Sequence, residues 1–63
     1  MKRRDLMKRL AQIAKAQGLE MDLTEGGNHT KVVIGDRTDV VPRHTEINEI
    51  TARSIIRKLE GRS

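Results

Sequence analysis

Hydrophobic side chains recur along this chain with two different periods, and each period predicts a different kind of element. In the first part of the chain, four apolar residues share one face at about 100° per residue, the turn angle of a helix: Leu6, Leu10, Ile13 and Ala14. Lysine and arginine occupy the opposite face. The pattern predicts an amphipathic helix over residues 3–17 that ends at Gly18, a residue suited to a left-handed C-terminal cap.

After this helix the period changes to two. Leucine and methionine alternate with polar residues, and two β-branched segments follow. Three strands are predicted, over residues 19–24, 30–34 and 38–41. Residues 26–28 and 35–37 predict the connecting turns, because glycine and asparagine tolerate positive φ. Pro42 closes the third strand, since it has no N–H to donate.

The last periodic segment predicts a second helix. Its apolar face is formed by Ala52, Ile55, Ile56 and Leu59. Asn48 or Thr51 is the expected N-cap, and Gly61 ends the helix. The resulting order, α-β-β-β-α, predicts an α+β fold in one domain over residues 1–63. A three-stranded antiparallel sheet with one apolar face can bury that face only under the two helices.

Composition limits the chemistry available to this fold. Hydrophobic residues make up 35% of the 63 residues and there is no aromatic residue, so any core is aliphatic and small. The absence of cysteine excludes disulfides, thiolate catalysis and cysteine-based zinc sites. No apolar run approaches the roughly 20 residues that cross a bilayer, and no apolar stretch follows the basic N-terminus. We therefore expect a soluble, cytoplasmic protein with no membrane partner.

The net charge of +4 is unevenly distributed. Residues 1–18 carry six basic residues and one acidic residue, and residues 51–63 carry four and one, whereas residues 19–50 carry three and seven. Two basic ends thus flank an acidic middle. This arrangement suits a polyanionic partner such as nucleic acid, although lysine and arginine on a solvated helix face would look the same.

The two histidines, His29 and His44, are the candidates for proton transfer near neutral pH, since imidazole titrates near about pH 6.5. Their spacing fits no metal motif and no local pattern supplies a third ligand, so we expect no metal site. His29 follows the 26–28 turn at the start of a strand, where hairpin pairing fixes the backbone. A base held there suits proton abstraction from a ribose hydroxyl. The alternative is a solvent-facing histidine at the end of a hairpin.

Several short segments of the chain stand in an order and spacing that resemble one known family. They are the basic segment 4–10 running into Gly18, the Gly27-Asn28-His29 motif, Val-Pro-Arg-His at 41–44 with Glu-Ile at 46–47, and Thr-Ala-Arg-Ser-Ile-Ile at 51–56. Together they make essentially the whole chain similar to the HicA family. These small toxins are ribonucleases that cleave mRNA and are held in check by a HicB-type antitoxin. The family's fold is a double-stranded-RNA-binding-like α-β-β-β-α sandwich, the same order as that predicted from the residues.

The resemblance implies the toxin of a type II toxin–antitoxin system, an endoribonuclease that needs neither a metal nor a cofactor. The family's catalytic histidine falls on His29, which would act as general acid or base while a ribose 2′-hydroxyl attacks the adjacent phosphorus. Five residues are the expected RNA contacts: Gly27, Asn28, Lys31, Arg43 and His44. For His44, catalysis, substrate contact and a loop hydrogen bond all stay open. The implied partners are mRNA and a HicB-type antitoxin that covers the active site, with the chain a monomer when free and part of a hetero-oligomer with the antitoxin.

Two departures from the family pattern bear on substrate recognition. Asn28 stands where the family has serine, and no aromatic residue follows His29. Substrate contact then rests on phosphate and 2′-hydroxyl groups, which predicts weak sequence preference and steep salt dependence. The alternative functions are a non-catalytic RNA-binding module of the same fold and a protein that binds an acidic partner. Glu46 and Glu49 argue against the module, because they occupy the start of the last helix, where such modules carry basic residues.

Overall fold

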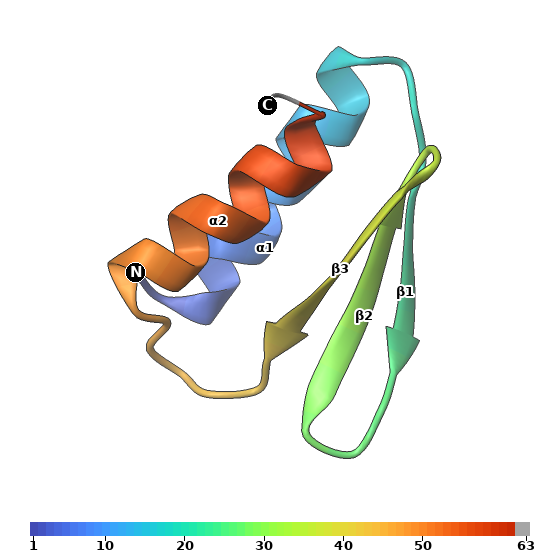
Figure 1. The fold of residues 1–63 in the computed structure, drawn as a ribbon. Coiled ribbons are helices and arrows are strands. Elements are labelled where there is room, and N and C mark those ends of the chain that lie inside the picture. Colours follow the sequence, from blue (N-terminus) through green and yellow to red (C-terminus); the bar gives the residue numbers. More distant parts are fainter. Residues whose placement is uncertain (62–63) are drawn as a thin grey trace.

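In a computed structural model that describes residues 1–61, two helices pack against one face of a three-stranded sheet (Figure 1). The elements in chain order are α1 (Arg3–Ala16), β1 (Met21–Glu25), β2 (His29–Ile34), β3 (Arg37–Pro42) and α2 (Glu49–Glu60). The sheet order is β1-β2-β3, and both strand pairs are antiparallel. The predicted α+β class and the α-β-β-β-α order are confirmed. Residues 62–63 of the predicted domain lie outside the described residues.

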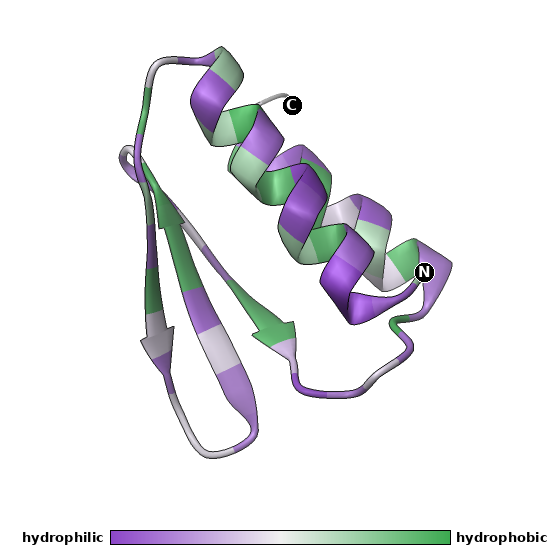
Figure 2. Ribbon diagram, turned by 180° about the vertical axis from the view of Figure 1, so that it is seen from behind, coloured by the Kyte–Doolittle hydropathy of each residue, from purple (hydrophilic) through white to green (hydrophobic). Residues whose placement is uncertain are grey.

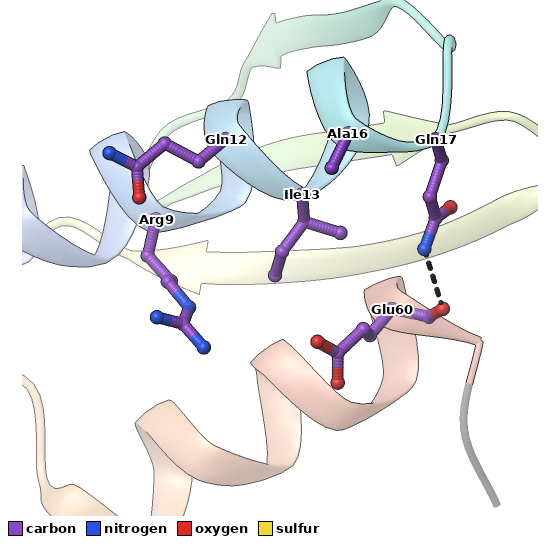
Figure 3. A pocket seen from close by; sticks show the side chains of 6 residues that line it. All are labelled: Arg9, Gln12, Ile13, Ala16, Gln17 and Glu60. Carbon is purple, nitrogen blue, oxygen red and sulfur yellow. Dashed lines mark hydrogen bonds between the residues drawn. The ribbon is translucent and has the colours of Figure 1, made fainter.

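The two helices lie side by side and run in the same direction (Figure 1). At their beginnings, the amino group of Met1 donates to the carbonyl of Ile47 at 2.9 Å, and the Ile47 N–H donates back to the Met1 carbonyl at 2.7 Å. At their ends, the Gln17 side-chain amide donates to the Glu60 carbonyl at 3.0 Å (Figure 3). The parallel arrangement therefore places both helix N-termini at one end of the molecule and both C-termini at the other.

The core is aliphatic and lies between the helices and the sheet. Its buried residues are Leu6, Leu10, Ile13, Ala14, Val32, Ile34, Val41, Ile47, Ala52, Ile55 and Leu59. All four apolar residues predicted for the first helix are among them, and Ile56 is the only predicted residue of the second helix that is half-buried instead. Figure 2 shows the corresponding hydrophobic stretches on β2, on β3 and along both helices.

The apolar side of β1 departs from the prediction. Alternation over residues 19–24 predicts a strand with one covered face, but the strand begins at Met21, and Leu19 and Leu23 stay 37% and 46% exposed. β1 is an edge strand, α2 packs mainly against β3, and α1 contacts β1 only sparsely. The two helices together are thus too narrow to cover all three strands.

The turn between β2 and β3 is tighter than predicted. The sequence predicts Arg37 in the turn, but this residue is the first of β3 and pairs with Ile34. Only Gly35 and Asp36 form the turn, with a φ of +63° at Gly35. As a strand residue Arg37 reaches the helices: its Nε donates to the Leu59 carbonyl at 2.8 Å, and its guanidinium also donates to the side-chain oxygen of Gln17. A cation at this position is favourable because the C-terminal ends of helices carry partial negative charge.

The ends of α2 follow local sequence signals. The Asn48 side chain accepts a hydrogen bond from the Ile50 N–H at 2.8 Å, so Asn48 rather than Thr51 is the N-cap. Gly61 is the C-cap in the left-handed conformation, with a φ of +83°. The Asn48 cap fixes where α2 begins, and therefore the length of the loop that follows β3, while Gly61 fixes where α2 ends.

Candidate active site

His29 is the first residue of β2, the central strand of the sheet, and its side chain is exposed. Burial alternates along this strand, with Thr30 and Val32 buried and His29 and Lys31 exposed. His29 and Lys31 therefore lie on the outer face of the sheet, away from the helices, which confirms the geometric prediction that they share a face. Lys31 pairs on both sides, with Thr24 and Val40, whereas His29 pairs with Pro42 of β3 and its carbonyl accepts a hydrogen bond from the Gly26 N–H, so the backbone under both side chains is held.

The turn before His29 forms as predicted but for a different conformational reason. The Gly26 N–H donates to the His29 carbonyl at 2.9 Å. None of residues 26–28 has a φ in the left-handed region, so the expected positive φ is wrong. Gly26 is favoured by space instead, because a Cβ there would be crowded at 3.1 Å from the His29 carbonyl oxygen. A Cβ on Gly27 would meet nothing within 4 Å, which leaves open space beside His29.

A hollow at this end of the sheet brings most of the predicted site residues together. Its lining residues are Gly27, Asn28, His29, Pro42, Arg43 and His44. The strand register sets His29 opposite Pro42, and the Arg43 N–H donates to the Asn28 carbonyl at 3.3 Å. The loop after β3 is thereby tied to the turn before β2. Five of the six predicted site residues line this hollow, and Lys31 follows on the outer face of β2.

A chain of hydrogen bonds behind the hollow was not predicted from the sequence. The Arg3 guanidinium donates through Nη2 to the Thr30 hydroxyl at 2.6 Å and through Nε to the Pro42 carbonyl at 3.1 Å. The Thr30 hydroxyl donates to Oε1 of Glu25 at 2.7 Å, and Nη2 of Arg43 donates to the same oxygen at 2.6 Å. We call this set of hydrogen bonds the Arg3–Thr30–Glu25–Arg43 network. It connects α1 with the end of β1, the beginning of β2, the end of β3 and the loop that carries Arg43.

Electrostatics within this network favour the ionised form of Glu25. The hydrogen bond from the Thr30 hydroxyl, followed by that from the Arg43 guanidinium, lowers the pKa of Glu25 below its ordinary value. The carboxylate therefore stays charged and holds Arg43 at the rim of the hollow. Thr30 gave a weak signal in the sequence, because it stands opposite Glu25 in a hairpin register. Arg3 gave none, since its partners lie far away along the chain.

Basic residues surround the same end of the molecule. Arg43 borders the His29 hollow and also two neighbouring hollows, one lined with Arg3 and Glu25 and the other with Lys2, Arg3, Arg4 and Thr45. Both helix N-termini, which carry partial positive charge, lie at this end. The local potential therefore favours an anion, although Glu46 and Glu49 form ion pairs with the amino group of Met1 at 3.6 and 3.4 Å.

Other parts of the described chain offer less chemistry. The hollow between the two helices is lined by Arg9, Gln12, Ile13, Ala16, Gln17 and Glu60 and contains none of the predicted site residues (Figure 3). Within residues 1–61, no three histidine, aspartate or glutamate side chains are grouped to hold a metal ion. No helix in that range has the length and apolar character needed to span a membrane.

Comparison with protein-family models, with curated proteins and with solved structures found no match to this chain.

Proposed function

We propose that this chain is the toxin of a type II toxin–antitoxin system, a metal-independent endoribonuclease that cleaves mRNA with His29 as a general acid or base. The observation that carries the proposal is the position of His29: exposed at the rigid start of the central strand, in a hollow shared with an arginine and a second histidine. A proton-transfer group must be accessible to substrate and must be carried on a well-held backbone, and the exposure of His29 on a paired strand supports this role.

The chemistry assigned to His29 is proton transfer during attack of a ribose 2′-hydroxyl on the neighbouring phosphorus. General acid–base help from one positioned group contributes about 10²–10⁴-fold. Arg43, at the rim of the same hollow, is placed to offset the charge that develops on the phosphate oxygens. Its pairing with Glu25 through Nη2 fixes the guanidinium and leaves its other N–H groups available for phosphate.

Recognition of RNA would depend on charge more than on bases. The chain has no aromatic residue on which a base could stack. Lys31, Asn28 and the open space beside Gly27 surround His29, so contacts to the sugar–phosphate backbone would orient the strand. Weak sequence preference follows from this, because backbone contacts carry no sequence information.

Control of such an activity would require a partner that covers the hollow. A HicB-type antitoxin is the partner that the sequence resemblance implies. The exposure of His29, Arg43 and His44 is compatible with burial of the site by a second protein, in a hetero-oligomer formed by an otherwise monomeric toxin. The cytoplasm, where mRNA is translated, is the compartment that this function requires.

A non-catalytic RNA-binding module of the same fold is the second candidate. The basic hollows around Arg43 favour it, since they could hold an RNA backbone without cleaving it. The two candidates differ in the effect expected from the loss of His29. In the module, His29 is a contact residue whose loss weakens binding, whereas in the nuclease its loss stops cleavage and spares binding.

The deciding experiment incubates purified protein with single-stranded RNA in the presence of EDTA. We expect the wild-type chain to produce fragments ending in a 2′,3′-cyclic phosphate, and His29→Ala to produce none while binding RNA with similar affinity. Lys15→Ala, an exposed substitution on α1, is the matched control and should cleave normally. Expression in cells should arrest growth for the wild type and the control but not for His29→Ala. Full-rate cleavage by His29→Ala, or intact RNA with the wild-type chain, would refute the nuclease.

A further inference from the structure

The two histidines of the chain line one hollow although a complete strand separates them in the sequence. Two contacts bring them together. His29 stands opposite Pro42 in the β2–β3 register, and the Arg43 N–H donates to the Asn28 carbonyl at 3.3 Å, so that the next residue, His44, lies beside the turn that carries His29.

Neither imidazole is engaged by the fold. Both side chains are exposed, and within the described part of the chain neither His29 nor His44 takes part in a side-chain hydrogen bond or ion pair. A role for His44 as a loop hydrogen-bond partner, which the sequence left open, therefore has no support. Both rings are free to exchange protons with a molecule in the hollow.

From this juxtaposition we propose that His44 is the second proton-transfer residue of the cleavage reaction, which makes the site a two-histidine centre. The inference rests on the proposed nuclease function and specifies how that site works. The 2′-oxygen forms a bond to phosphorus and loses its proton to one imidazole. The bond from phosphorus to the 5′-oxygen breaks, and the other imidazole gives its proton to that oxygen. The products are a 2′,3′-cyclic phosphate and a 5′-hydroxyl, and the reaction needs no further co-reactant.

The charged groups around the hollow are compatible with proton removal by one imidazole and proton delivery by the other. Arg43 is the charged neighbour of both imidazoles, and its own partner Glu25 lies outside the lining of the hollow at 2.6 Å from the guanidinium. No carboxylate is among the lining residues, so no acidic side chain of the lining competes with phosphate for the imidazoles, and Glu25 engages Arg43 through Nη2. Two imidazoles and one guanidinium are a sufficient set for proton removal, proton delivery and charge neutralisation at one phosphorus.

The test measures kcat/KM against pH for a short fluorescent RNA in EDTA, across the imidazole titration range of about pH 5 to 8. We expect a bell-shaped profile for the wild-type chain, because one imidazole must be neutral and the other protonated. His44→Gln, which keeps hydrogen-bonding capacity but cannot titrate, should lose one limb of the bell and about 10²-fold or more in rate. Gln12→Ala, an exposed change on α1, is the control and should keep the full profile. Circular dichroism should show all three proteins equally folded.

A second substrate separates the two proton transfers. Replacing the 5′-bridging oxygen by sulfur gives a leaving group that departs without a proton. Restoration of the rate of His44→Gln on this substrate would identify His44 as the acid. Restoration of His29→Gln instead would make His44 the base. Either result supports the two-histidine centre.

The proposal and the function beneath it fail in different ways. If the wild-type chain does not cleave RNA, both fall together. If cleavage depends on His29 while His44→Gln keeps its rate and both limbs of the bell, the endoribonuclease stands and the role of His44 is refuted.

Discussion

Replacing Thr30 by valine removes one hydroxyl from the network behind the hollow and changes little else. Thr30 is fully buried, at 0% exposure, and is the one buried polar residue among residues 1–61. Its hydroxyl accepts a hydrogen bond from Arg3 at 2.6 Å and donates one to Glu25 at 2.7 Å. Valine has nearly the same shape but leaves both charged partners without this contact.

The expected loss follows from those two hydrogen bonds. Hydrogen bonds to charged groups contribute about 1.5–3 kcal/mol each when buried. Arg3 retains its bond to Pro42 and Glu25 retains Arg43, and both charges reach solvent, so we expect a net destabilisation of about 1–2 kcal/mol. A domain of this size has roughly 3–9 kcal/mol of stability in total. The change should lower Tm by roughly 4–16 °C.

Urea unfolding followed by circular dichroism is the suitable assay, because a chain without aromatic residues has no intrinsic fluorescence to follow. Thr38→Val, at an exposed position on the outer face of β3, is the matched control and should be neutral within about 0.5 kcal/mol. A Thr30→Val protein as stable as the wild type would show that the network contributes nothing to the fold.

The pH dependence of stability provides an independent check on the same network. The folded-state pKa of Glu25 is lowered from its ordinary value of 4.5, so its contribution to stability is fully present above that value and is lost as pH falls through the folded pKa. Since Thr30 is the largest cause of that lowered pKa, Thr30→Val should flatten this acid loss. An equal acid loss in both proteins would contradict the assigned cause.

Three further outcomes are expected. Arg37→Ala should lower the free energy of unfolding, measured in urea, by about 1–2 kcal/mol, because the Arg37 guanidinium binds the C-terminal end of α2. Arg57→Ala, on the exposed surface of that helix, is the control and should leave this free energy almost unchanged. Gly27→Ala should leave stability within about 0.5 kcal/mol of wild type, since a methyl group there meets no protein atom. It should slow RNA cleavage, because the methyl group fills the space beside His29. Unchanged cleavage would place the substrate elsewhere. Lys31→Ala, made in the His29→Ala background, should weaken the salt dependence of binding to single-stranded RNA. The slope of log affinity against log salt concentration should fall by about 0.7, as expected for one lost phosphate contact. An unchanged slope would remove Lys31 from the interface.

Much of the candidate site could be named from the sequence because its residues lie in short segments with recognisable chemistry. His29 follows a glycine turn, and Arg43 and His44 follow a proline that ends a strand. Alternation along β2 also placed Lys31 on the face of His29. That Arg43 and His44 join His29 in one hollow was beyond such reasoning, since it depends on the strand register and on the contact from Arg43 to Asn28.

The features that follow from the amino-acid sequence are local: the two amphipathic helices, the three strands and the caps at Asn48 and Gly61. Periodicity and capping involve residues a few positions apart, so neighbouring side chains are enough to specify them. Three other features depend on packing between distant segments: the partner of Arg3, the contact of Arg37 with the helix ends and the exposure of Leu23 on β1. Each of these depends on how two short parallel helices cover a wider sheet, and that geometry arises from packing between segments far apart in the chain.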